Sequence, residues 1–301
     1  MSAVSRPLRH PGIVVYLCGL TTSILALGAV ELLNKSAINV MGFYVNGILP
    51  AGALLVGISS GLGYAAASRV LQTKLFGAFI ATMVVTALLD YSAAQYLTYA
   101  NLLEQHRVAA EQYPFTQYVR DICEKMSFVS SGSDKPGSEL GLFGYFFKLL
   151  EMAGYVLGAT LPSLVVSNMP YCKGCQKYLT KYRTAFFSSS TPWADIKKLA
   201  KKQREPALES AIAPLLDRAG QLCQDMVAVS LSDTVALLDD LDAKPIPGTA
   251  AHVVLTLQKC PTCDAHVVQA TLVNYTADKK VANRTISRLE KIEPVAAEPS
   301  T

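Results

Sequence analysis

Four long runs of apolar residues dominate the first part of the chain. The runs cover about Ile13 to Leu33, Gly42 to Ala65, Leu75 to Tyr96 and Phe143 to Val166. A helix needs about 20 apolar residues to cross a bilayer, and each run is long enough. No run of this kind follows Val166, so the sequence predicts a four-helix transmembrane domain in residues 1–167 and a polar region after it.

The composition agrees with this division. Hydrophobic residues make up 51% of the 301 residues, charged residues make up 17%, and the mean hydropathy is +0.29. Soluble domains usually carry about 25% charged residues, so these values argue against a disordered chain, a collagen or a plain cytosolic enzyme. A net charge of +4 gives no reason to expect a nucleic-acid partner.

The distribution of basic residues predicts the orientation in the membrane. They gather in the N-terminal tail, in the link between the second and third spans and just after the fourth span, at Arg6, Arg9, Arg69, Lys74, Lys173, Lys177, Lys181 and Arg183. The long link over 97–142 holds more acidic than basic residues. Because basic residues stay on the cytoplasmic side, we expect both termini in the cytoplasm, an outer helical link at 97–142 and insertion in the inner (plasma) membrane. The first run is too long for the core of a signal peptide, so we expect an uncleaved span.

The second run is rich in small residues. Gly57 and Gly61 form a small-xxx-small pair, which lets two helix backbones approach closely within lipid. Such a pair indicates either packing against another span of the same chain or a homo-oligomer interface. Pro50 predicts a kink in this helix.

Polar residues within the spans predict a second feature. At a similar depth in the outer leaflet we expect Glu31, Asn46, Asp90, Lys148 and Glu151. A charge in hydrocarbon costs at least about 2.5 kcal/mol, so such residues usually face the bundle interior and pair. The surplus of acidic groups is compatible with a cation or proton site in a small transporter or channel component. An interfacial structural cluster is the alternative, because transporters normally show more spans or internal repeats.

Two CxxC motifs are the strongest chemical signal in the chain. They supply four thiols, at Cys172, Cys175, Cys260 and Cys263. Four thiolates suit tetrahedral zinc, and the two-residue spacing lets one turn direct two sulfurs at one ion. The sequence therefore predicts one structural Zn²⁺ per chain. His266 lies three residues after Cys263 and is a weaker candidate ligand.

The residues around the motifs predict a zinc ribbon. His252 to Gln258 and Val267 to Tyr275 are typical of two strands that flank the second motif, and Lys177 to Phe187 is a candidate third strand. Compact ribbons separate their motifs by about 15–20 residues. Here 84 residues separate Cys175 from Cys260, so an insert must split the ribbon.

The insert, over about 191–241, is predicted to be helical. The expected fold is therefore a transmembrane helical domain followed by a cytoplasmic α+β domain at 168–292, built on a split zinc ribbon, with a disordered tail at 293–301. A CxxC motif can also serve thiol–disulfide exchange, and Cys260-Pro-Thr-Cys263 is similar to the glutaredoxin type. That chemistry requires the first cysteine at a helix N-terminus, whereas a β-rich stretch follows here.

One segment resembles a known group of proteins. The stretch Met41-Gly-Phe-Tyr-Val-Asn-Gly-Ile-Leu-Pro-Ala-Gly-Ala-Leu-Leu-Val-Gly resembles a segment of uncharacterised bacterial four-span membrane proteins that also carry a cytoplasmic split CxxC…CPxC ribbon. The resemblance implies a bacterial inner-membrane protein and implies no activity. The sequence contains no phosphate loop, GxSxG, HExxH or dinucleotide fingerprint.

These observations lead to three hypotheses of function. The first is a non-enzymatic integral membrane protein that displays a zinc-ribbon domain to the cytoplasm for protein interaction or assembly. The alternatives are a small transporter or channel component, which would use the intramembrane acids, and a membrane thiol–disulfide oxidoreductase, which would use one CxxC motif.

Overall fold

The chain folds into two compact units. The computed structural model describes residues 11–36, 38–75, 77–127, 139–275 and 281–291, so the predicted tail at 293–301 lies outside the described residues. Contacts divide the chain into Met1–Asn168 and Met169–Thr301. The division falls one residue after the boundary that hydropathy predicts.

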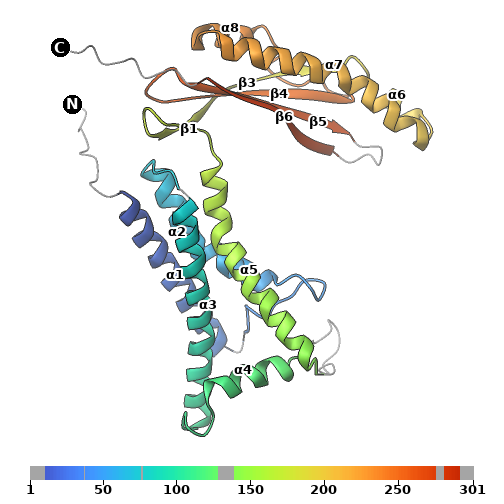
Figure 1. The fold of residues 1–301 in the computed structure, drawn as a ribbon. Helices are drawn as coiled ribbons and strands as arrows, with labels where there is room; N and C mark the ends of the chain where they lie inside the picture. The colour runs from blue at the N-terminus through green and yellow to red at the C-terminus, as the bar shows by residue number, and fades with distance from the viewer. Residues whose placement is uncertain (1–10, 37, 76, 128–138, 276–280, 292–301) are drawn as a thin grey trace, which may run out of the picture. The chain divides into compact units, whose positions relative to one another are not determined.

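Helices build the described part of the first unit (Figure 1). They are α1 (Pro11–Lys35), α2 (Ala51–Val70), α3 (Gly77–His106), α4 (Phe115–Glu124) and α5 (Leu142–Ser167). Four of them, α1, α2, α3 and α5, are long and apolar enough to cross a membrane, which confirms the four predicted apolar helices. Many of their large apolar side chains, such as Leu25 and Leu89, are exposed. Lipid accommodates such surfaces, whereas water disfavours them.

The second span begins later than the sequence predicted. Residues 45–49 form a turn in which Val45 pairs with Leu49, and Pro50 directly precedes α2. Proline is tolerated at a helix start, where its missing N–H is not needed, so it causes no internal kink here. Asn46 has a φ of 54°, in the left-handed region, and therefore lies in the connection between α1 and α2 rather than within a span.

The small residues of α2 pack within the chain. A Cβ atom at Gly57 would overlap the carbonyl oxygen of Tyr155, and one at Gly61 would overlap that of Ala159. Gly158 of α5 approaches the backbone of α2 just as closely. Glycine is therefore required on both sides of the α2–α5 contact. Helix α5 covers the face of α2 that bears Gly57 and Gly61, so in this chain the pair serves the contact between two spans.

The predicted outer link divides between two helices. Its first helical part is the end of α3, which continues to His106, and its second part is α4. Helix α4 crosses between α3 and α5 near the start of α5 (Figure 1), and it packs against both. Tyr118 and Cys123 on its inner side are buried. Helix α4 thus joins α3 and α5 through its packing against both.

A four-stranded antiparallel sheet is the centre of the second unit. Its strand order is β3 (Thr180–Ser188), β4 (Ala251–Lys259), β5 (His266–Tyr275) and β6 (Val281–Lys291). The first three confirm the predicted strands. Strand β6 was not predicted, because its sequence mixes charged and apolar residues without a regular alternation. As an edge strand it pairs on one side only, and edge strands often carry charges.

The insert covers one face of this sheet. It contains α6 (Trp193–Lys198), α7 (Lys201–Ala228) and α8 (Leu231–Asp239), as the sequence predicted. Helix α7 lies along the sheet (Figure 1), and the shared core comprises Leu215, Ala219, Cys223 and Met226 from α7 with Val253, Leu255, Leu257, Val268, Ala270 and Leu272 from the strands. This packing fixes the hairpin that bears the second CxxC motif.

Candidate metal centre

The first CxxC motif lies in a short hairpin. Strands β1 (Tyr171–Cys172) and β2 (Lys177–Tyr178) pair antiparallel, with Cys175 in the turn between them. The rings of Tyr171 and Tyr178 meet edge to face, with centroids 4.9 Å apart. Gln176 has a φ of 51°, and this left-handed residue directs the chain back after the second cysteine. The hairpin therefore holds both sulfurs on one side.

The second motif lies in the turn between β4 and β5. The N–H of Cys260 donates to the carbonyl of Ala265 over 2.8 Å and closes this turn. Lys177 Nζ donates to Thr262 Oγ1 over 2.9 Å and joins the two cysteine turns. Because β4 and β5 are anchored by the core beneath α7, the turn is presented by a rigid hairpin.

The four predicted cysteines meet at one point. Their Sγ atoms all lie within 4.8 Å of one another, and Cys172 Sγ is 3.7 Å from Cys263 Sγ. A tetrahedral zinc ion with bonds of about 2.3 Å separates its sulfurs by about 3.8 Å. A disulfide would need about 2.05 Å, and all four cysteines are free thiols. The donor set and its spacing thus fit one metal ion, and the predicted convergence is confirmed.

An apolar shell surrounds the sulfurs. Cys172 and Cys260 are 9% and 3% exposed, and Leu179, Ala265 and Val267 pack around them. Solvent therefore reaches the site mainly past Cys175 and Cys263, which are half-buried. A shell of this kind limits solvent access to a bound ion.

Backbone amides set the charge of one thiol. Burial raises the pKa of Cys260, but hydrogen bonds from the N–H groups of Thr262 and Cys263 and from the thiols of Cys263 and Cys175 together outweigh burial, and the pKa falls to about 7. Burial raises the pKa of Cys263 to about 12, and the neighbouring thiols contribute to this rise. Cys260 is therefore more readily ionised than Cys263. Metal binding requires thiolates and releases the protons of thiols, so the affinity for an ion increases with pH.

His266 is not part of the metal site. Its side chain is 1% exposed, with Nδ1 2.9 Å from the carbonyl oxygen of Asp264 and Nε2 3.3 Å from that of Met226. Met226 lies in the last turn of α7, where carbonyls lack partners within the helix. His266 thus ties the second cysteine turn to the end of α7. Its position on the buried face of β5 was the sequence signal for a structural role.

The predicted intramembrane residues do not form one cluster. Glu31 pairs with Lys35 on its own helix over 3.5 Å and accepts a hydrogen bond from Asn101. Asn46 is exposed in the α1–α2 connection, and Oδ2 of Asp90 is buried without a hydrogen-bond partner among the described residues. Only Lys148 and Glu151 meet. The shared acidic site that a transporter would use is therefore not assembled from these residues.

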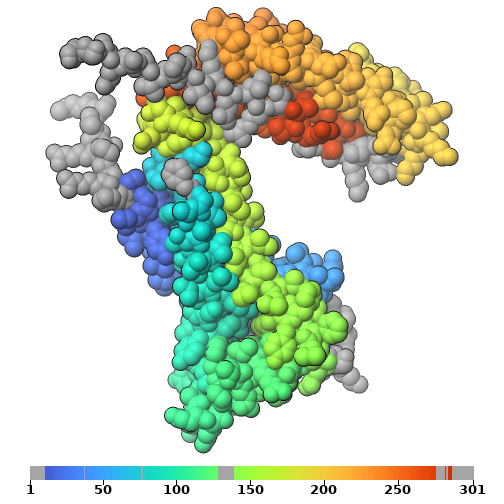
Figure 2. Space-filling view, viewed as in Figure 1, coloured from blue at the N-terminus to red at the C-terminus, as the bar shows by residue number. Residues whose placement is uncertain are grey.

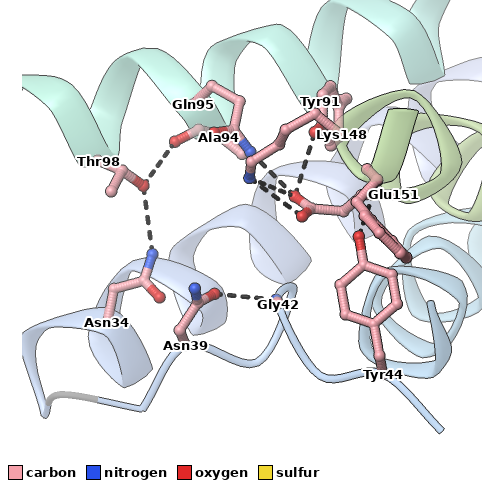
Figure 3. Close-up of polar contacts among 11 residues, drawn as sticks. Asn34, Asn39, Gly42, Tyr44, Tyr91, Ala94, Gln95, Thr98, Lys148 and Glu151 are labelled. Atoms are coloured by element: carbon pink, nitrogen blue, oxygen red, sulfur yellow. Dashed lines mark hydrogen bonds and ion pairs between the residues drawn. The ribbon is translucent and has the colours of Figure 1, made fainter. Parts of the chain in front are cut away.

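Glu151 is instead the centre of a smaller network (Figure 3). It is 1% exposed, and its Oε1 and Oε2 lie 3.1 and 3.0 Å from Lys148 Nζ. Tyr91 OH and Gln95 Nε2, one turn apart on α3, donate to Oε1 over 3.1 and 3.3 Å. A buried carboxylate requires such partners. Tyr91 was not predicted as a site residue; the sequence signal for it was its spacing of four residues from Gln95 within an apolar run.

The chemistry of the metal centre is that of a closed site. Four thiolates complete a tetrahedral ion and leave no position for a substrate or an activated water. The four thiols are placed so that one bound ion would join two distant segments of the chain. Comparisons of the chain with known protein families, with curated proteins and with solved structures found no match.

Proposed function

We propose that this chain is a non-enzymatic protein of the bacterial inner membrane, whose C-terminal unit is closed by a structural zinc ion and displayed in the cytoplasm for protein interaction or assembly. The convergence of two distant CxxC motifs on one point is the observation that supports it most. Zinc is the ion that four thiolates select among the common redox-inert metals. A thiol oxidoreductase would place one motif at a helix start, whereas here both motifs lie in turns between strands.

The sheet provides a surface for such a partner. Helix α7 covers one face, and the opposite face carries half-buried residues that no described residue covers fully: His252, Val254 and Thr256 on β4, with Gln269, Thr271 and Val273 on β5. This face mixes β-branched and hydrogen-bonding side chains, as non-obligate protein interfaces do. The metal centre lies at one end of the same two strands and would fix their ends.

The proposed orientation leads to a first prediction. Reporter proteins fused at Ser131 and at the C-terminus should show opposite activities, because an even number of spans separates two cytoplasmic termini from an outer link. A reporter that is active only outside the cytoplasm should work at Ser131 and fail at the C-terminus. Outside activity at the C-terminus would contradict the proposed orientation.

The proposed interaction leads to a second prediction. A photo-cross-linking residue introduced at Thr256 should trap a discrete partner in intact cells, because this residue lies in the middle of the uncovered face. The matched control places the same photo-cross-linking residue at Lys197, an exposed position on α6, where it should trap no discrete partner. Removing the metal ligand Cys260 should abolish the cross-link at Thr256 while the protein stays in the membrane. An unchanged cross-link in the Cys260→Ser variant would contradict a role for the metal-closed unit.

A further inference from the structure

A cavity of about 650 Å³ lies beside Glu151 in the helical unit. It is bounded by the α1–α2 connection, α3, α4 and α5, and Figure 2 shows this end of the unit, where α4 and the start of α5 meet at the surface. Its size falls within the range of about 300–1,000 Å³ that is usual for small-molecule sites. Neither the metal centre nor the sheet takes part in it.

The charged residues of the cavity form two balanced pairs. On α5, Lys148 Nζ and Glu151 Oε2 are 3.0 Å apart, and on α4, Lys125 Nζ and Asp121 Oδ1 are 3.3 Å apart. Tyr113 OH also donates to Asp121, over 2.9 Å, and lowers the pKa of this carboxyl group, so Asp121 stays ionised. The lining therefore presents both signs of charge and no formal net charge.

Several polar atoms of the lining have unused hydrogen-bonding capacity. Lys148 has three N–H donors, and among the described residues only Glu151 accepts from them. Gln95 and Asn34 each use their amide nitrogen, to Glu151 and Thr98, and their side-chain oxygens accept no hydrogen bond from any described residue. Figure 3 shows Gln95 and Lys148 together at Glu151, with Asn34 of α1 farther along, beside Thr98 of α3. A donor with a positive charge and an acceptor thus lie together beside a buried carboxylate.

We propose that this cavity binds a zwitterion that carries a primary ammonium group and an anionic group. The ammonium would lie against the side-chain oxygen of Gln95, near the buried carboxylate of Glu151, and the anion against the remaining N–H of Lys148. The ion pairs of the lining already balance each other, so a ligand with a net charge would leave that charge uncompensated in a partly buried site, which is costly. A primary ammonium suits hydrogen-bond acceptors, whereas a quaternary one is recognised by aromatic faces.

Two sources supply this chemistry: a free amino acid and the headgroup of phosphatidylethanolamine. In the first experiment, the full chain in phosphatidylcholine nanodiscs should bind tritiated glycine saturably if the ligand is a free amino acid. In the second, the chain released from nanodiscs of mixed lipids should retain phosphatidylethanolamine over phosphatidylcholine and phosphatidylglycerol in native mass spectrometry if the ligand is the lipid. The first result assigns the free zwitterion and the second the lipid. Glycine betaine, which has no N–H, should not compete with either ligand.

Two matched variants test the site. Gln95→Met removes an ammonium acceptor, and we expect it to weaken binding about tenfold or more, as the loss of a hydrogen bond to a charged group does. Asn101→Leu is the matched control. Asn101 is also an amide on α3 that donates to a glutamate, Glu31, but Asn101 lies outside the cavity, so binding should stay within about twofold of the wild type. Glu151→Gln should abolish binding. If the Glu151→Gln variant does not fold, the result for Gln95→Met tests the proposal. Competition by betaine, equal loss in both α3 variants, or neither glycine binding nor lipid selection would overturn the proposal.

Discussion

Replacing Cys260 with serine should release the metal ion and expose the C-terminal unit to proteases, while the helical unit still inserts into the membrane. A bound ion would join β1 and β2 to the β4–β5 turn across 84 intervening residues, so its loss would free both segments. Structural zinc contributes folding energy directly, with apparent values of about 10–16 kcal/mol in small zinc peptides. The helical unit should be unaffected, because its helices are stabilised by lipid and by their own packing.

Metal analysis and limited proteolysis of the purified full chain test this prediction. The wild-type protein should contain one zinc ion per chain, and the Cys260→Ser variant should contain much less and lose its C-terminal unit to protease. The matched control is Cys223→Ala, which removes a buried thiol of the same unit from the α7 core and should keep the zinc ion. A wild-type protein without zinc under reducing conditions, together with a reversible disulfide within either CxxC motif, would favour the oxidoreductase hypothesis.

Hydropathy and cysteine spacing predicted most of the fold. The four apolar helices follow from length and composition, and the three strands around the cysteines follow from alternation, because burial along β4 switches at every residue from Ala251 to Leu257. The start of α2 was misplaced because hydropathy does not detect backbone conformation. The stretch before Pro50 is apolar enough for a span, yet it forms a turn that contains the left-handed Asn46.

The two candidate sites differ in how far the sequence could define them. The CxxC spacing fixes the local geometry of each pair, and tetrahedral coordination would require two pairs, so the convergence of the four cysteines was predictable across a long insert. The intramembrane cluster was predicted from depth alone. Depth does not say which way a helix faces, and Tyr91 and Gln95 face Glu151, whereas Asp90 makes no hydrogen bond to it. The relative rotation of helices is set by packing, which a single sequence does not reveal.

Adding a single methyl group at Gly57 should strongly destabilise the helical unit. The new Cβ would overlap the carbonyl oxygen of Tyr155 and lie 2.9 Å from the amide nitrogen of Ala159. Both are backbone atoms and cannot rotate away, so α2 and α5 must separate along their contact. Overpacking of this kind costs about 1–3 kcal/mol and occasionally more.

Gly28→Ala on α1 is the matched control, because a Cβ there meets no atom within 4 Å. Alanine favours helix over glycine by up to about 1 kcal/mol, so this variant should be as stable as the wild type or slightly more stable. The unfolding temperature measured in detergent should therefore fall for Gly57→Ala and stay the same or rise slightly for Gly28→Ala. If Gly57→Ala left the unfolding temperature unchanged and altered only the oligomeric state, the pair would be an interface between chains. The close α2–α5 contact would then not be what holds the four apolar helices together.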